Sequence, residues 1–452
     1  MNPDRPIAPV LWKRFLLFSA PLVLGNILQA LSGTLNAIYA GRLLGVTSYA
    51  AIAVVTPILL FLSAFIAGFG SGASILAGQA WGAKDVVKLQ TIAGTALFAG
   101  VALGVGLALI GVPLARQALE LIGAPPETVT EALVYAQVML GSLPLMFTAV
   151  LAAALLRGTG DSKTPLLVLS IGSTVVLILT PALILGRIGL PPMGISSAAW
   201  ATSIGTLISL IWLAWDLRRR KHPLAFNLVL LRYVRPHPLL WRITKLGLPT
   251  GLFFVIGSMA DVALMRIANG YGMHATAAWG IVNQVVAYVQ FPGLSIAIAA
   301  SIFSSQAIGR GFPEQLKTVT RTALWTSFIF SCGIALLAVT QSDGILAMFT
   351  SNEGVAMLAK RLVWIAVLGS VILGLSSVLT AVMRASGMVL WPTLISLSCL
   401  AFVLVPLGAS LSQVLELPGL RMAYPITYLI GLLMHASFFN LVWKRRAVKK
   451  LI

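Results

Sequence analysis

The chain has 452 residues, of which 58% are hydrophobic and only 10% are charged. Soluble domains carry about a quarter charged residues, so this composition excludes a water-soluble globular protein. A formal net charge of +19 would indicate a nucleic-acid partner for a soluble chain. In a membrane protein the same excess more often reports orientation, and the order of the loops decides between the two.

Long apolar runs fill the sequence and predict an all-α integral membrane protein with twelve spans. A run of about 20 apolar residues is long enough for a helix to cross a bilayer, whereas barrel strands are shorter and alternate apolar with polar residues. The first run lacks a cleavage site, so we expect it to span the membrane. The predicted spans are Phe15–Ala40, Val46–Ala77, Ile92–Ile110, Ala132–Leu156, Leu166–Leu185, Ile195–Trp215, Leu246–Ala268, Ala275–Gln306, Ala323–Thr340, Leu362–Met383, Leu390–Leu411 and Met422–Trp443.

The loops between these spans carry unequal charge. Assigned alternately to two sides, the loops on the side of the N-terminus hold 24 of the 31 basic and 5 of the 12 acidic residues, and the other side holds 7 basic and 6 acidic. Basic loops stay cytoplasmic, so we expect a plasma (inner) membrane protein with both termini in the cytoplasm. The basic excess then needs no nucleic acid, and it can attract anionic membrane lipids.

The two halves of the chain repeat one pattern at a constant offset of half the chain length. The stretch “RGTGDSKTP” begins at Arg157, and “RASGMVLWP” begins at Arg384. At the same offset, Gln79 in “GQAWGA” matches Gln306 in “SQAIGR”. Six spans per copy place both copies in the same orientation, a parallel repeat. We predict a six-helix lobe at residues 1–217, a cytoplasmic linker at 218–245 and a second six-helix lobe at 246–452.

The stretch “RGTGDSKTP” looks like a phosphate loop, but Arg157 and Ser162 stand where that loop requires glycine. We interpret it as a cytoplasmic turn. Glycine suits the end of a helix, and proline suits the first turn of the next one. We therefore expect Gly160 to end the fourth span, Thr164 to cap the fifth and Pro165 to lie in its first turn.

The chain resembles the MATE family, the multidrug and toxic compound extrusion transporters. The resemblance rests on “AGQAWGAKD” after the second span, “RGTGDSKTP” after the fourth, “GMHATAAWGIVNQ” at the eighth and the twelve-span layout. It covers the chain from about Leu11 to Trp443. It implies two six-helix lobes that form a V, and export of small organic, often cationic, compounds driven by entry of H⁺ or Na⁺. We expect a monomer without a cofactor or a metal.

Two positions depart from the pattern of that family. Members often carry a functional aspartate late in the first span, where this chain has Asn36. Many also have an Asn and an Asp in the fifth span, where this chain has Val176 and Thr180. An asparagine can coordinate Na⁺ through its carbonyl oxygen but cannot carry a proton, which argues against proton coupling in the first lobe. Asn36 and Thr180 stay candidates for the cation or substrate site.

Asp261 is the one carboxylate predicted inside a span. A charge at the centre of a membrane helix costs about 2.5–3.5 kcal/mol on insertion scales, so such residues usually face a cavity or form a pair. We expect either a site for the driving cation or a cationic substrate, or a structural ion pair with Arg266, five residues further on.

Other polar residues in the spans are candidates for lining a substrate cavity. Asn283 and Gln284 are adjacent in the eighth span and point about 100° apart, so at most one of them faces a given direction. A histidine among apolar residues is more often a packing residue than a titrating one. The cavity-lining candidates are Asn283, Gln284, Tyr39, Gln29 and His435.

Two other functions compete with that of an exporter. A related class, the flippases of lipid-linked oligosaccharides, tends to line its cavity with cationic residues, and the predicted spans here are nearly free of Arg and Lys. A membrane enzyme is disfavoured because no metal-binding pair of histidines, paired acidic cluster or nucleophile elbow is present. The sequence therefore favours a secondary exporter without catalytic residues.

Overall fold

The structure is a computed structural model that describes residues 11–123, 125–186, 192–225 and 238–452, and every regular element in these ranges is a helix. Ten of its helices are long and apolar enough to cross a membrane, and an eleventh span is the pair α5 (Pro126–Gly141) and α6 (Leu143–Thr159), bent by 50°. Hydrocarbon offers no partners to backbone groups, so a helix, which satisfies them internally, is the expected solution. The class predicted from composition is confirmed.

The helices follow the predicted spans closely. In the first half they are α1 (Leu11–Leu43), α2 (Val46–Gly82), α3 (Val86–Gly111), the short α4 (Ala115–Ile122), α5, α6, α7 (Lys163–Ile184) and α8 (Ser196–Arg219). In the second half they are α10 (Leu239–Asn269), α11 (Met273–Arg310), α12 (Gln315–Thr340), the short α13 (Ser342–Ala347), α14 (Glu353–Ala385), α15 (Leu390–Ser398) and α16 (Val405–Leu441). A π-helical stretch, Cys399–Leu404, joins α15 to α16.

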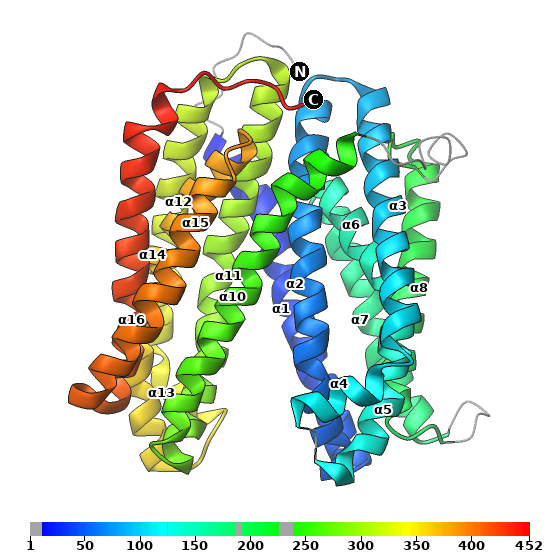
Figure 1. Cartoon of the computed structure of the whole chain (residues 1–452), viewed down its shortest axis with the longest axis vertical. Coiled ribbons are helices and arrows are strands. Elements are labelled where there is room, and N and C mark those ends of the chain that lie inside the picture. Colours follow the sequence, from blue (N-terminus) through cyan, green and yellow to red (C-terminus); the bar gives the residue numbers. More distant parts are fainter. Residues whose placement is uncertain (1–10, 124, 187–191, 226–237) are drawn as a thin grey trace. The chain divides into compact units, whose positions relative to one another are not determined.

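The final apolar segment, Leu390–Arg445, contains two spans. Glu416, inside α16, has the non-helical angles φ 54° and ψ −138°. A Cβ atom on Gly419 would lie 2.2 Å from the carbonyl oxygen of Leu411, which is eight residues earlier and would be about 12 Å away along a straight helix. The chain therefore turns back at Glu416, as the orange and red ribbon shows (Figure 1). Ten helices, the bent pair and this division are consistent with the predicted twelve spans.

The predicted repeat is present in the backbone. Gly45 precedes α2 with φ 100°, and Gly272, one repeat later, precedes α11 with φ 92°. Gly160 ends α6 with φ 93°, and its counterpart Gly387 has φ 89° after α14. The short helices α4 and α13 also begin at equivalent positions of the two copies. These left-handed angles are cheap for glycine, so the glycines punctuate both copies at equivalent places.

The described contacts divide the chain into two compact units, residues 24–251 and residues 1–23 with 252–452. The start of α1 packs in the second of these units, where Phe15 and Phe18 contact Phe303 of α11. The units thus differ from the lobes expected at residues 1–217 and 246–452 in where they place this first part of α1 and residues 246–251 of α10. The lobes and the 218–245 linker, of which residues 226–237 lie outside the described ranges, stay a prediction.

Each unit packs its second, third and fourth spans closely, but with small residues on different helices. In the first copy Gly104 of α3 lies against the backbone of Pro144 in α6. In the second copy the equivalent of Gly104 is Ser331, and the close contact moves to Gly293 of α11 and Gly374 of α14, where a Cβ on Gly293 would lie 3.1 Å from the Cα of Gly374. Small residues let membrane helices approach closely and gain dispersion contacts.

The turn “RGTGDSKTP” is built as a helix-to-helix connection. Gly160 ends α6, as predicted. Ser162 precedes α7 without a capping hydrogen bond of its own, and the capping group is Asp161, whose Oδ1 accepts hydrogen bonds from the backbone N–H groups of Lys163 and Thr164, both at 3.0 Å. The prediction that Thr164 caps this helix is wrong, because Thr164 lies inside α7 and its hydroxyl donates to Asp161. A carboxylate at a helix N-terminus satisfies free N–H groups and complements the helix dipole.

The described start of the loop after α8, residues 220–225, contacts α2 through His222. The ring of His222 stacks on Trp81, with 6.0 Å between ring centroids. Burial lowers the pKa of His222, although nearby Asp161 and Asp216 act in the opposite sense. The imidazole is therefore neutral at pH 7, and its Nδ1 accepts a hydrogen bond of 3.2 Å from the backbone N–H of Leu224.

The close glycine contact in the second unit gives a stability prediction. We expect Gly374→Leu to destabilise the protein by about 1–3 kcal/mol, because the new side chain meets Gly293, Ser327 and Ser331 within 3.1–3.4 Å. Gly333→Leu is the matched control, since no atom lies within 4 Å of its added Cβ. Thermal unfolding in detergent measures both. Equal unfolding temperatures for the two variants would show that the contact is unimportant.

Candidate functional site

Polar side chains from three helices of the second unit meet in one cluster, in which Arg421 and Tyr424 are buried and Asp261 and Asn283 are exposed. Asp261 lies on α10, Asn283 on α11, and Arg421 and Tyr424 on the second part of α16. The hydroxyl of Tyr424 donates a hydrogen bond of 2.7 Å to Oδ1 of Asp261. Since a tyrosine hydroxyl stabilises a charged carboxylate or pairs with a neutral one, the bond fixes the position of Asp261 in either state.

Arg421 is the buried charge of this cluster, with only 3% of its surface exposed. Its Nη1 donates a hydrogen bond of 2.8 Å to Oδ1 of Asn283. Its guanidinium carbon lies 5.0 Å from the ring centroid of Trp279 and 4.9 Å from that of Tyr424. Two aromatic faces attract a cation through their π electrons, by about 2 kcal/mol where water is excluded. The amide and the rings together hold a guanidinium that the apolar surroundings would otherwise disfavour.

Asp261 and Arg421 have opposite exposure. Asp261 is exposed at the surface of its unit, whereas Arg421 is covered and its Nε has no hydrogen-bond partner among the described residues. Tyr424 lies between them, bonded to the carboxylate and stacked against the guanidinium. The alternative of a structural ion pair between Asp261 and Arg266 is not realised in the salt bridges of the described chain. Asp261 is therefore open to a small cation on one side and positioned by Tyr424 on the other.

Arg421 was missed by the sequence reasoning, which began the twelfth span at Met422 and left the arginine in a loop. The helix in fact resumes directly after the turn at Glu416, with Pro418 in its first turn. Proline favours that position, so the proline itself was a usable signal for an earlier helix start. The interpretation that the spans are nearly free of Arg and Lys therefore left out Arg421, and the spanning helix α14 also carries Lys360 and Arg361.

Two candidates of the first unit contact each other. The hydroxyl of Thr180 on α7 donates a hydrogen bond of 2.9 Å to Oδ1 of Asn36 on α1. Thr180 is fully buried, while Asn36 and Tyr39 are partly buried and Gln29 is exposed. Asn36 and Thr180 thus form one neutral polar contact that joins the two helices.

The cavity-lining candidate His435 of the second unit makes its contacts outside the cluster of Asp261. His435 is 2% exposed. Its Nδ1 lies 2.9 Å from the hydroxyl of Ser376, and its Nε2 lies 3.0 Å from the carbonyl oxygen of Pro392. Both ring nitrogens are therefore within hydrogen-bond distance of a polar atom, and the buried His435 lines no open space. Gln284, next to Asn283, is partly buried.

The chain contains two copies of a pattern of six spans, and polar side chains lie on otherwise apolar helices. These features are typical of membrane transporters built from internal repeats. A sequence profile of the MatE family matches residues 21–182 and again residues 249–409. The chain therefore belongs to the MATE family, whose members are multi-pass membrane transporters and not enzymes.

Individual relatives agree with this assignment over nearly the full length. The chain is 38% identical over 447 residues to the “Probable multidrug resistance protein YoeA” of Bacillus subtilis (strain 168), covering 98% of this chain and 96% of that protein. It is 22% identical over 382 residues to the “Multidrug export protein MepA” of Staphylococcus aureus (strain MRSA252), covering 83% and 82%. A solved structure of an outward-facing multidrug resistance MATE family transporter has a TM-score of 0.87 at 21% identity, covering 96% and 97%.

The bond between Arg421 and Asn283 gives a second prediction. We expect Asn283→Leu to destabilise the protein by about 1–3 kcal/mol, because it leaves a buried guanidinium without its acceptor. The same substitution is expected to cost much less when Arg421 is already replaced by Met. Thermal unfolding of both single variants and the double variant measures the coupling. Additive effects would contradict the assignment.

Proposed function

We propose that this protein exports small organic compounds, chiefly cations, across the plasma membrane in exchange for entering H⁺ or Na⁺, and that it acts as a monomer. The observation that carries the proposal is Asp261, an exposed carboxylate within an apolar span that accepts a hydrogen bond from Tyr424. The names of the relatives, which refer to multidrug resistance and multidrug export, support organic compounds as the substrate class.

Asp261 supplies what coupling requires. Exchange of one ion for another solute needs a group whose affinity for the driving ion differs between the two facing states, since a ligand shifts an equilibrium only by that difference. Asp261 can hold either a small cation or the charge of an organic cation, and two cations at one carboxylate repel each other. Entry of the driving ion therefore favours release of the substrate.

The surroundings of Asp261 favour H⁺ over Na⁺ as the driving ion. A proton needs a single carboxylate oxygen, whereas a metal cation is best held by several oxygen atoms. The carbonyl oxygen of Asn283 is already used by Arg421. The pair of Asn36 and Thr180 is the alternative, because its neutral oxygens suit Na⁺ and carry no proton.

Transport in proteoliposomes tests this proposal. We expect Asp261→Asn, which keeps the shape and removes the charge, to lower export driven by a proton gradient at least about tenfold, equivalent to about 1.4 kcal/mol. The measurement is uptake of a fluorescent organic cation into proteoliposomes by protein inserted inside-out. The H⁺ and Na⁺ gradients are imposed separately.

Glu353→Gln, in the first turn of α14, is the matched control and is expected to leave export unchanged. Export by Asp261→Asn at the wild-type rate under the same proton gradient would place the coupling site elsewhere. Export driven by Na⁺ alone and lost in Asn36→Leu would then transfer the role to Asn36 and Thr180.

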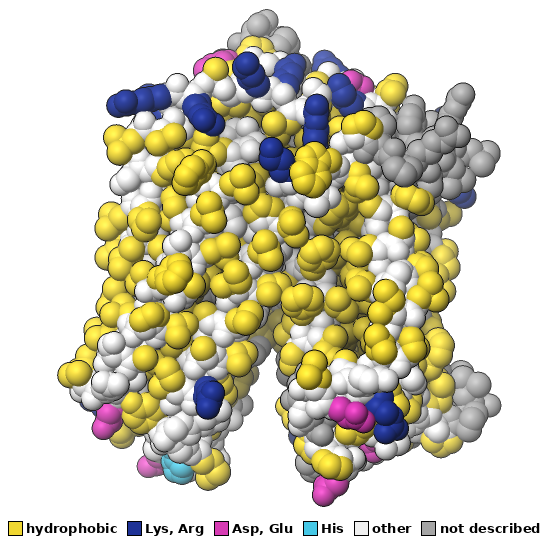
Figure 2. Space-filling view, in the orientation of Figure 1, with side chains coloured by type: hydrophobic (Ala, Val, Ile, Leu, Met, Phe, Trp, Pro, Cys, Tyr) yellow, Lys and Arg dark blue, Asp and Glu magenta, His cyan; other side chains and the backbone are white. Residues whose placement is uncertain are grey.

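We also propose that both termini and the loop after α8 lie in the cytoplasm. Figure 2 shows Lys and Arg gathered at one end of the helices in each unit. The last turns of α6, α8, α11 and α14 all carry arginine at this end. Basic loops are retained in the cytoplasm during insertion.

Cysteine labelling in intact cells tests the orientation. In a variant with both native cysteines replaced by alanine, we expect a membrane-impermeant maleimide to label Met348→Cys and to spare Arg219→Cys. Met348 is 85% exposed and follows α13, and Arg219 is exposed in the last turn of α8. Both sites react after the cells are opened, which controls for accessibility. The reverse pattern in intact cells would invert the topology.

A further inference from the structure

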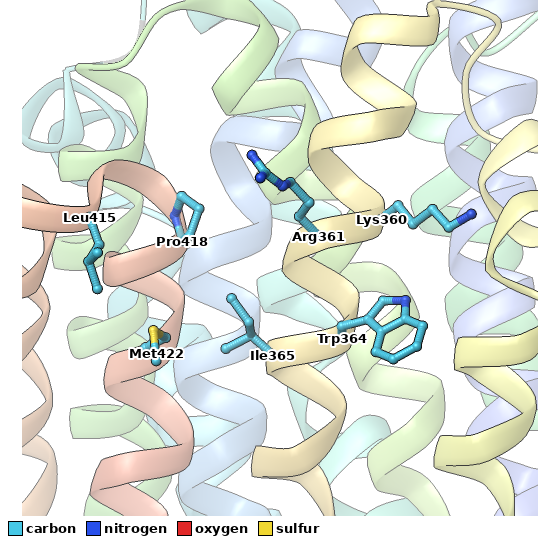
Figure 3. Close-up of a pocket in the computed structure, with 7 residues that line it drawn as sticks. All are labelled: Lys360, Arg361, Trp364, Ile365, Leu415, Pro418 and Met422. Carbon is cyan, nitrogen blue, oxygen red and sulfur yellow. The ribbon is translucent and has the colours of Figure 1, made fainter.

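A groove of about 650 Å³ lies in the second unit, between α14 and the part of α16 around the turn at Glu416. Its size falls in the range of about 300–1,000 Å³ that is usual for ligand sites. Figure 3 shows Arg361 and Ile365 extending from α14 toward Pro418 and Met422 of α16. The lining residues are Lys360, Arg361, Trp364, Ile365, Leu415, Pro418 and Met422.

The groove carries one positive charge that the described chain leaves unbalanced. The ammonium group of Lys360 lies 2.6 Å and 2.7 Å from the two carboxylate oxygens of Asp343, so this charge is neutralised. The guanidinium of Arg361 forms no salt bridge with any described residue. A guanidinium has five N–H donors in a planar fork that matches the oxygens of a phosphate. An anion is therefore the ligand that complements the polar end of the groove.

The rest of the groove is apolar and lies in a membrane-spanning segment. Trp364, one turn beyond Lys360, is 54% exposed, and Leu368 on the following turn is 64% exposed. Exposed apolar side chains on a span contact lipid chains, and tryptophan is enriched where the chains meet the headgroups. Along α14 the side chains thus change from the cationic Arg361 to the aromatic Trp364 and then to the aliphatic Leu368, within about two helical turns.

We propose that this groove binds an anionic phospholipid, with its phosphate on Arg361 and its acyl chains along Trp364, Ile365 and Met422. This ligand has the same order of polarity as the groove. An organic cation would be repelled by Arg361, and a small water-soluble anion would leave the apolar lining without a partner. The site does not depend on the proposed transport function, since it requires only that the chain is embedded in a membrane.

Fluorescence quenching by brominated lipids tests the site in detergent-solubilised protein. The signal of Trp364 is isolated as the difference between the wild type and Trp364→Phe. We expect brominated phosphatidylglycerol to quench it at lower concentration than brominated phosphatidylcholine. We expect Arg361→Gln to weaken quenching by phosphatidylglycerol about fivefold, the effect of about 1 kcal/mol for one basic residue at an anionic membrane surface.

Arg266→Gln is the matched control, because Arg266 is an exposed arginine at the end of α10 and does not line the groove. It is expected to leave quenching unchanged. Equal quenching by the two lipids, or equal affinity of the wild type and Arg361→Gln, would overturn the proposal. Displacement of the lipid by glycerol phosphate at a similar concentration would also overturn it, since it would reveal an anion site that ignores the acyl chains.

Discussion

Hydrocarbon offers no hydrogen-bond partners, and the structure depends on this constraint at every level. Each backbone N–H and C=O of a span must be satisfied by its own helix, which leaves the helix as the one regular element of the described chain. Many Ser and Thr side chains follow the same rule by donating to the carbonyl oxygen four residues earlier, as Thr56 does to Ile52 at 2.7 Å. Some groups that are not satisfied within one helix form hydrogen bonds across helices.

Those few groups mark the candidate sites. Asp261 reaches Tyr424, and Arg421 reaches Asn283, each by a bond between helices that are far apart in sequence. Tyr424 contacts both the carboxylate of Asp261 and the guanidinium of Arg421, so these side chains form one connected cluster without a direct salt bridge.

The two copies of the repeat have similar backbones but carry different polar side chains. At the offset that relates Arg157 to Arg384, Asp261 and Asn283 correspond to Thr34 and Thr56, so the charged cluster exists in the second copy alone. The first copy has the neutral contact of Asn36 and Thr180, whose counterparts in the second copy are Ala263 and Leu407. Two halves with a similar backbone can carry different polar side chains because helix packing constrains size and apolarity more than it constrains a single polar position.

The second part of α16 carries residues of both the charged cluster and the groove that we propose for a phospholipid. Arg421 belongs to the cluster and Met422 to the groove, and consecutive residues of a helix point about 100° apart. The turn at Glu416 and the proline at 418 fix where this part of the helix begins.

The sequence by itself determined the membrane class, the helices, the repeat and the family, because these follow from local hydropathy, from glycine and proline positions and from short motifs. It also identified Asp261, since a carboxylate in an apolar run is visible without a fold. It did not reveal that Tyr424 and Arg421 accompany Asp261, or that Asn36 contacts Thr180, which lies 144 residues away. Such contacts depend on how helices cross and rotate, and many rotations satisfy the same apolar pattern, so only the tertiary structure decided them.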